Sequence, residues 1–369
     1  MLAIGFSSLA LGILNSLHKF FIPAISPGVF NLIVIGFLLA ICPLFAQPIK
    51  ALAIGIVAGG FAQFIFQLPL IIKKGYLKRL NLNFHNKGVK KIFFLMVPAM
   101  WGLSIHEVNV FVDTVCASLL VQGSVSALYY ANRLMQLPLA LFGTAAVTVA
   151  LPMMAKSAAK QDLSQMKTTL FSGLKLALWT IIPSSVGLIV LGKPIIRLLF
   201  EHGAFSRQAT QQTAWALLFY VLGIFAFAGV KLFAAAFYSL KDTATPVKIA
   251  SLAMLVNIVL NIVLMRFLAV GGLALATSLA SGLNLGLLTV VLRKRIGNLE
   301  FTGLASWLGR VILASSGMGI SVMAIADYIG PGNKIFQALV PLGVAIVVYY
   351  FLARILKIEE VKYVNKIFR

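Results

Sequence analysis

Four residues with oxygen-bearing side chains stand out because they lie inside long apolar stretches of the sequence. They are Asp113, Asn257, Asn261 and Thr277. Asn257 and Asn261 are four residues apart, so on a helix they share one face. A carboxylate with neutral oxygens is a ligand set that a hard alkali cation prefers, whereas polar side chains between membrane helices also act as ordinary hydrogen-bonding partners. The residues alone leave both interpretations open.

One arginine, Arg133, also lies deep in an apolar stretch, nine residues beyond a glycine-serine turn. Its guanidinium stays charged and offers five donors in a fork that suits phosphate. We therefore expect an anionic head group in an aqueous cavity as its ligand. The alternative is a buried ion pair with Asp113 or Glu107. Lys231 and Arg310 are within snorkelling reach of the polar boundary of their helices, so they need no ligand to reach water.

The composition indicates that the solvent around most of the chain is lipid. Hydrophobic residues make up 60% of the 369 residues and charged residues 11%, against roughly 45–50% and about 25% in soluble domains. Cys42 and Cys116 lie in separate apolar stretches, so they predict neither a disulfide framework nor a metal site. The sequence contains no glycine-rich phosphate loop and no nucleophile paired with a base, which favours a transporter over an enzyme.

The apolar stretches predict an all-α polytopic membrane protein, because each is long enough to cross a hydrocarbon core ~30 Å thick as a helix. Pro and Gly residues separate the stretches. We expect eleven transmembrane helices, at approximately 1–17, 28–45, 51–72, 92–120, 125–154, 169–191, 209–239, 246–268, 271–292, 303–326 and 335–356.

The distribution of basic residues predicts the orientation of these helices. The net charge is +22, yet no soluble basic domain exists to bind nucleic acid. When the connections are assigned alternately to two sides, 22 of the 31 Lys and Arg residues fall on one side, six on the other and three within helices. Lys and Arg mark the cytoplasmic side. The C-terminus is therefore expected in the cytoplasm, and an odd number of helices places Met1 at the outer face.

A short internal repeat indicates that the chain resembles only part of a longer pattern. Ser16-Leu17-His18 with Pro23 recurs as Ser239-Leu240-Lys241 with Pro246, 223 residues later. Parallel repeats of this kind are common in transporters. If each copy closes the fourth helix of a six-helix lobe, three helices are expected to be absent from the first lobe. A chance match of three similar residues and a proline is the alternative.

Several motifs together resemble a known family. They are Leu14 to Phe20 with Pro23-Ala24, Pro27 and Asn31; Gly123 to Ser126 with Tyr129 to Leu134 and Pro138; Val230-Lys231 with Phe237 to Ser239, Asp242 and Thr245 to Lys248; and Leu199 to Phe205. In order and spacing they are similar to the lipid II flippases of the MurJ (MviN) type, within the superfamily that also holds multidrug and polysaccharide exporters.

The resemblance implies a two-lobe, inverted-V transporter of which this chain corresponds to helices four to fourteen of fourteen. Residues 1–72 would then be the C-terminal half of an incomplete first lobe, with three helices. Residues 73–91 would be a basic cytoplasmic loop, and residues 92–292 a second lobe of six helices. Residues 303–357 would be a final helix pair that forms a groove for the lipid tail.

The resemblance also implies roles for single residues. Arg133 would contact the diphosphate of the substrate, Ser126 would line the same cavity, and Asn132 and Lys231 in the matching motifs would bind the substrate with them. Asp113, Asn257, Asn261 and Thr277 would match a sodium site. Asn261 stands where the sodium-binding pattern has Asp, which removes one negative charge.

The expected function is to flip lipid II across the bacterial inner membrane by alternating access. Sodium or the membrane potential would supply the energy, and no other cofactor is expected. The expected partners are lipid II, membrane lipids and the cell-wall synthesis machinery. The alternatives are an exporter of polysaccharide-lipid intermediates or of cationic drugs on the same fold, and a truncated remnant that does not transport. An acidic cavity would favour a drug exporter, and Arg133 argues against it.

Overall fold

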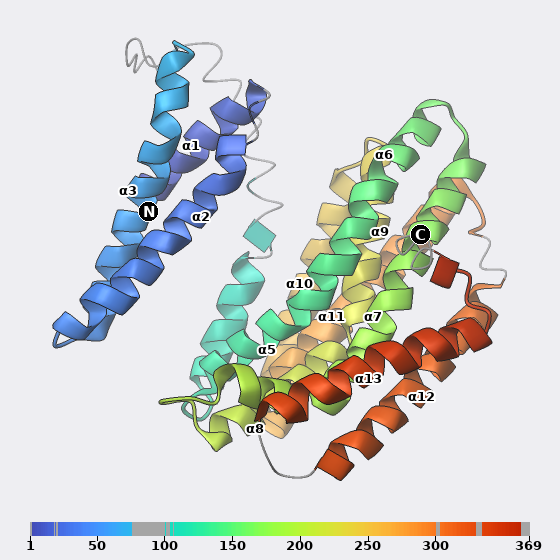
Figure 1. The fold of residues 1–369 in the computed structure, drawn as a ribbon. Helices are drawn as coiled ribbons and strands as arrows, with labels where there is room; N and C mark the ends of the chain where they lie inside the picture. The colour runs from blue at the N-terminus through green and yellow to red at the C-terminus, as the bar shows by residue number, and fades with distance from the viewer. Residues whose placement is uncertain are drawn as a thin grey trace. The chain divides into compact units, whose positions relative to one another are not determined.

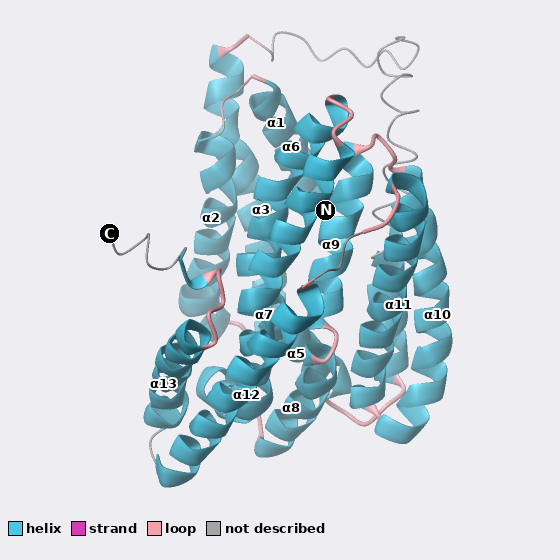
Figure 2. Cartoon of the chain, turned by 90° about the vertical axis from the view of Figure 1, so that its right-hand side faces the viewer, coloured by secondary structure: helices cyan, strands magenta, loops and turns pink. Residues whose placement is uncertain are grey.

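A computed structural model describes residues 2–17, 19, 21–75, 100, 104, 105, 107–299, 303–329 and 334–362. Every regular element in these ranges is a helix (Figure 2). The α-helices are α1 (Leu2–Ser16), α2 (Phe21–Gly36), α3 (Pro48–Lys73), α5 (Ser124–Pro138), α6 (Ala145–Ala159), α7 (Leu163–Phe200), α8 (Arg207–Val221), α9 (Ile224–Ser239), α10 (Ala244–Leu268), α11 (Val270–Ile296), α12 (Leu304–Ile329) and α13 (Lys334–Ile355). Residues 107–118 are also helical.

Short irregular helices extend two of these elements. A π-helix, Phe37–Ile41, and a 3-10 helix, Cys42–Leu44, follow α2, and a second π-helix, Leu139–Thr144, joins α5 to α6. Side-chain caps begin α7 and α8, where Asp162 accepts a hydrogen bond from the backbone N–H of Gln165 and Ser206 accepts one from that of Ala209. Such caps satisfy donors that the first turn of a helix leaves unpaired.

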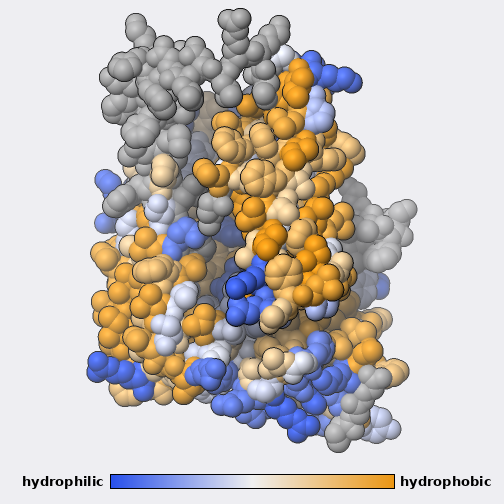
Figure 3. All heavy atoms as spheres, turned by 90° about the vertical axis from the view of Figure 1, so that its left-hand side faces the viewer, coloured by the Kyte–Doolittle hydropathy of each residue, from blue (hydrophilic) through white to orange (hydrophobic). Residues whose placement is uncertain are grey.

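The chain is a multi-pass membrane protein. Eight described helices are long and apolar enough to cross a membrane, and α8 with α9 counts as a ninth if this bent pair is one span. On the face drawn in Figure 3, apolar side chains cover much of the surface. Each of the eleven predicted ranges contains described helix. The number of eleven spans itself stays a prediction.

The stretch predicted as one helix at 209–239 is two helices in the structure. The axes of α8 and α9 differ by 46°, and Gly223 lies between them. A Cβ atom on Gly223 would lie 2.5 Å from Oγ of Ser278 on α11. The Ser278 hydroxyl also donates a hydrogen bond of 2.7 Å to the backbone carbonyl of Phe219. α11 therefore packs into the break, and its serine satisfies a backbone acceptor there.

The chain folds into two compact units, Met1–Phe94 and Leu95–Arg369. In the first unit, α2 and α1 both pack on α3 (Figure 1). The buried side chain of Gln67 donates a hydrogen bond of 2.8 Å to Oγ of Ser7, which ties α3 to α1. Of the predicted basic loop 73–91, residues 76–91 lie outside the described residues.

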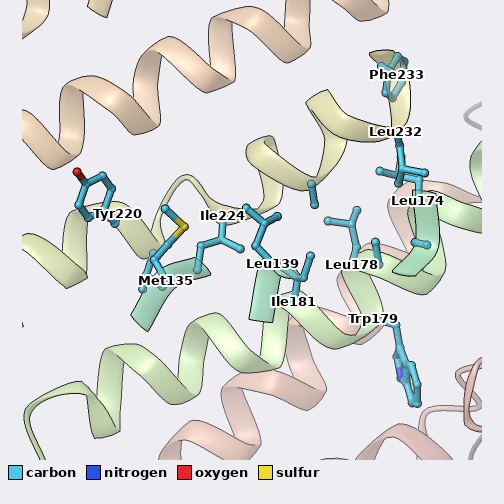
Figure 4. Packing of buried hydrophobic residues seen from close by; sticks show 14 of the residues in the cluster. Met135, Leu139, Leu174, Leu178, Trp179, Ile181, Tyr220, Ile224, Leu232 and Phe233 are labelled. Carbon is cyan, nitrogen blue, oxygen red and sulfur yellow. The ribbon is translucent and has the colours of Figure 1, made fainter. Parts of the chain in front are cut away.

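The second unit has one large core, to which α5, α7, α8 and α9 contribute buried apolar side chains (Figure 4). The final helix pair shares this core, because Trp307 and Val311 of α12 belong to it. Tyr349 of α13 donates a hydrogen bond of 2.7 Å to the backbone carbonyl of Trp179 on α7. The predicted division of the chain into a lobe fragment, a second lobe and a separate helix pair stays a prediction.

Candidate binding cavity in the second unit

A cavity of about 490 Å³ lies within the second unit. Its walls come from Ile105, residues 109–113, α5 with the following π-helix, α8, α9, α10 and α11. Apolar side chains such as Leu139 and Phe227 form part of the lining. The polar lining is Asn109, Asp113, Asn132, Gln136, Tyr220, Lys231, Asn257, Thr277, Ser281 and Asn284. The apolar unit thus contains a partly open cavity with polar side chains in its wall, and intramembrane polar residues facing a cavity are candidates for function.

The four predicted cation ligands form one hydrogen-bonded cluster, in which Asp113, Asn257 and Thr277 line the cavity and Asn261 lies behind them. Asn261 donates hydrogen bonds through Nδ2 to Oδ1 of Asp113, at 2.6 Å, and to Oδ1 of Asn257, at 2.9 Å. Asn257 donates in turn to Oγ1 of Thr277, at 3.3 Å. Asp113, Asn257 and Asn261 are 7%, 1% and 0% exposed. Because α10 packs on α11, residues that are far apart in sequence form one oxygen-rich cluster.

The donor set of this cluster fits a monovalent hard cation. Oδ1 of Asn261 is buried and has no hydrogen-bond partner. The carboxylate of Asp113 and the side-chain oxygens of Asn257, Asn261 and Thr277 are the ligands that such an ion would use. The Asn261 amide now directs N–H groups at two of these oxygens and would have to turn first. Hard oxygen ligands with a single negative charge suit an alkali ion. Within the described ranges, no group of three or more His, Cys, Asp or Glu residues could hold a metal ion.

Arg133 and Ser126 lie outside the lining of this cavity. Ser126, Tyr129 and Arg133 are spaced by three and four residues on α5 and are all exposed, so they form one face of the helix. The guanidinium of Arg133 lies over the ring of Tyr129, 5.0 Å from its centroid. The described ion pairs join Arg133 to neither Asp113 nor Glu107. The alternative of a buried ion pair for Arg133 is therefore wrong.

Asn132 and Lys231 do line the cavity, so the four predicted substrate residues form two separate groups. Nζ of Lys231 donates a hydrogen bond of 3.1 Å to Oγ1 of Thr144 at the end of the π-helix. Asn132 accepts a hydrogen bond from Gln136. Asn132 and Arg133 separate because consecutive residues of a helix point about 100° apart.

Five polar lining residues belong to none of the sites expected from the sequence: Asn109, Gln136, Tyr220, Ser281 and Asn284. Thr277, Ser281 and Asn284 are four and then three residues apart on α11, which is the spacing of one helix face. This spacing could have predicted from the sequence that the three side chains lie on the same face of a helix. The position of Tyr220 at the cavity could not have been predicted, because a tyrosine near the end of an apolar stretch is equally typical of a membrane boundary.

Two carboxylates outside the spans tie helix ends together. Asp242, before α10, accepts hydrogen bonds from the backbone N–H and the hydroxyl of Thr245, at 3.0 and 2.7 Å, and pairs with Arg295. The backbone N–H of Thr245 contributes most to holding the pKa of Asp242 below its usual value. Glu201, after α7, accepts a hydrogen bond of 2.7 Å from Thr210, which lowers its pKa.

Comparison with known proteins identifies the family that the chain matches. The family model described as lipid II flippase MurJ matches residues 1–340. A protein of Vibrio cholerae serotype O1 described as a probable lipid II flippase MurJ is 39% identical over 285 residues, which are 77% of this chain and 54% of the relative. One of Haemophilus influenzae with the same description is 35% identical, over 84% of this chain and 62% of the relative. The chain thus spans a little over half the length of these relatives.

A solved structure has a similar fold. Its description is lipid II flippase MurJ, inward closed conformation, and it aligns with 100% of this chain and 72% of its own. The TM-score is 0.79 and the sequence identity is 26%. The similarity covers both compact units of the chain.

Proposed function

Since the chain belongs to the MurJ family of lipid II flippases, we propose that it moves lipid II across the bacterial inner membrane and is a transporter, not an enzyme. The observation that carries the proposal is the family match over residues 1–340. The structural similarity over the whole chain supports it.

The physical task explains why polar residues are needed inside the membrane. A diphosphate-linked sugar-peptide head group has to cross ~30 Å of hydrocarbon while its polyprenyl tail stays in lipid. In our proposal Arg133 contacts the diphosphate, because its exposed guanidinium is held over Tyr129 with its fork of donors free of any described ion pair. The final helix pair, α12 and α13, guides the tail.

We further propose that sodium or the membrane potential drives the cycle. Asp113, Asn257, Asn261 and Thr277 would hold the sodium ion, and its charge would offset that of the Asp113 carboxylate. Each charge that crosses the full potential gains about 2.3 kcal/mol per 100 mV, which is sufficient to bias an alternating-access equilibrium. The C-terminus lies in the cytoplasm in this proposal, and cell-wall synthesis enzymes use the delivered substrate.

The proposal is tested in a bacterium whose own flippase can be depleted. The chain is expressed there, and the fraction of lipid II that an externally added head-group-cleaving enzyme can reach is measured. We expect the chain to restore this accessible fraction and Arg133→Ala to remove it. Arg207→Ala is the matched control, because Arg207 is an exposed arginine at the start of α8. If the chain is present in the membrane and lipid II stays inaccessible, the proposal is wrong.

The same experiment separates the alternatives. If another lipid-linked saccharide becomes accessible while lipid II does not, the chain is an exporter on this fold. If no lipid-linked saccharide moves, the remnant alternative applies.

A further inference from the structure

The cavity of the second unit contains more polar groups than a cation site needs. Asn132, Gln136, Ser281, Asn284 and Lys231 all line it, and none belongs to the proposed sodium ligands. Three of the five are carboxamides, which both donate and accept hydrogen bonds. A ligand that itself carries donors and acceptors therefore matches this part of the lining.

Asn284 provides the most specific evidence. Its side chain lines the cavity, and its Oδ1 is buried with no hydrogen-bond partner. Among the described residues that line the cavity, Asn109 and Asn284 each have such an oxygen. Buried polar atoms without a partner are rare and call for an explanation. Because water cannot reach this oxygen, the Asn284 amide would have to turn toward the cavity before a donor on a ligand could supply the missing partner.

The size and charge of the cavity narrow the choice of ligand. Its volume of about 490 Å³ is far more than a bare ion occupies and lies in the lower part of the ~300–1,000 Å³ range of sites that enclose small molecules. Asp113 and Lys231 are the only formal charges in the described lining, so the cavity has nearly no net charge. A diphosphate would be held poorly there, whereas a neutral group would be held well.

The apolar part of the cavity wall also suits a sugar ring. Phe227 and Lys231 are four residues apart on α9 and both line the cavity, so an aromatic side chain and an ammonium share one helix face. A pyranose ring has polar hydroxyls around its edge and C–H groups on its faces, and it needs both kinds of contact. The cavity offers carboxamides for the former and Phe227 with Leu139 for the latter.

We propose that this cavity binds one N-acetylated sugar ring of the lipid-linked head group, while the diphosphate lies outside it at Arg133. The acetamido and hydroxyl groups would bond to Asn132, Gln136 and Asn284. The inference rests on the proposed function, and it assigns two parts of one substrate to two separate groups of side chains. Sugar recognition would then depend on the second unit independently of phosphate recognition.

The test compares two ligands on the purified full chain. One is a polyprenyl diphosphate that carries an N-acetylated sugar, and the other is the same polyprenyl diphosphate without the sugar. Binding of each is measured for the wild type, Asn284→Leu, Gln136→Leu, Arg133→Ala and the control Gln208→Leu, which changes an exposed residue of α8. Thermal unfolding of each variant is measured alongside.

We expect the wild type and Gln208→Leu to prefer the sugar-bearing lipid. Asn284→Leu and Gln136→Leu should each weaken binding of that lipid about tenfold and leave the sugar-free lipid unchanged, whereas Arg133→Ala should weaken both. Asn284→Leu should not lower the unfolding temperature, because the asparagine oxygen has no partner to lose.

Two results would overturn the inference while the proposed function stands. One is a wild type that binds both lipids equally, and the other is an Asn284→Leu variant that unfolds at a lower temperature and weakens both lipids alike. If the wild type binds neither lipid, the proposed function fails, and the sugar site fails with it.

Discussion

Asp113 is the only carboxylate that lines the cavity of the second unit, among the residues that the structure describes there. Its Oδ1 accepts a hydrogen bond of 2.6 Å from Asn261, and Asn109 lies 3.4 Å from its Oδ2. Residue types and the spacing of four between Asn257 and Asn261 were sufficient to predict that these side chains belong together. Their hydrogen-bond partners could not be predicted, because they depend on how α10 meets residues 107–118.

Asp113→Ala should destabilise the protein by about 1–3 kcal/mol, because one buried N–H of Asn261 then loses its acceptor. Thermal or denaturant unfolding of the purified chain measures this loss. Asp327→Ala is the matched control, since Asp327 is exposed on α12, and it should have little effect. Equal unfolding of both variants would show that the cluster contributes nothing to stability.

Asn261→Asp tests the cation interpretation of the same cluster. The second carboxylate should destabilise the protein in sodium-free buffer, because like charges then lie close together. Sodium should reverse this effect and stabilise the variant more than it stabilises the wild type. The measurement is the unfolding temperature in sodium chloride against the chloride of a large organic cation at equal ionic strength. A variant that responds equally to both salts contradicts a sodium site.

At the scale of elements, the sequence predicted where helices lie but not where they break. The hydropathy of residues 209–239 is continuous, and one glycine in an apolar stretch is usually tolerated at a cost of ~1 kcal/mol. The break at Gly223 depends on Ser278, which is 55 residues away on α11. The sequence likewise could not predict that Asn132 lines the cavity and Arg133 does not, since only the packed helix shows which side of α5 faces the cavity.

Gly223→Ala should destabilise the second unit by about 1–3 kcal/mol, which is typical of overpacking. The new Cβ would lie 2.5 to 2.7 Å from atoms of Ser278, including its Cα, so rotation of the serine side chain alone cannot relieve the clash. Gly282→Ala on the same helix as Ser278, α11, is the control, because no atom lies within 4 Å of a Cβ built there. Unfolding that is equal in the two variants would mean that the contact at the break is loose.

The junction of α9 and α10 should be sensitive to acid. The hydrogen bonds of Thr245 and the charge of Arg295 lower the pKa of Asp242 in the folded protein. The stabilisation is therefore present above the unfolded pKa of ~3.9 and is lost as the pH falls through the lower, folded value. Asp242→Asn should cost about 1–2 kcal/mol at neutral pH, and this difference should shrink below about pH 4. A difference that persists at full size well below that pH would contradict this explanation.

At the scale of the whole molecule, composition and charge predicted a polytopic helical membrane protein, and the described helices confirm that class. The reason is physical, since 60% hydrophobic residues cannot be buried inside one soluble domain and lipid has to surround them. The polar cavity could not be predicted from composition, because it forms only where several helices of the second unit meet. The polar part of its lining nevertheless consists of residues whose polarity was visible in the sequence.

The most direct test of the central claim is transport by the purified chain in lipid vesicles that contain lipid II and carry both a sodium gradient and a membrane potential. An enzyme that cleaves the head group is added outside, and the fraction of lipid II that it can cleave is measured over time. We predict that the chain makes the inner-leaflet lipid II cleavable and that Arg133→Ala leaves it protected. If the inner pool stays protected in vesicles that contain the folded wild-type chain, the chain does not flip lipid II.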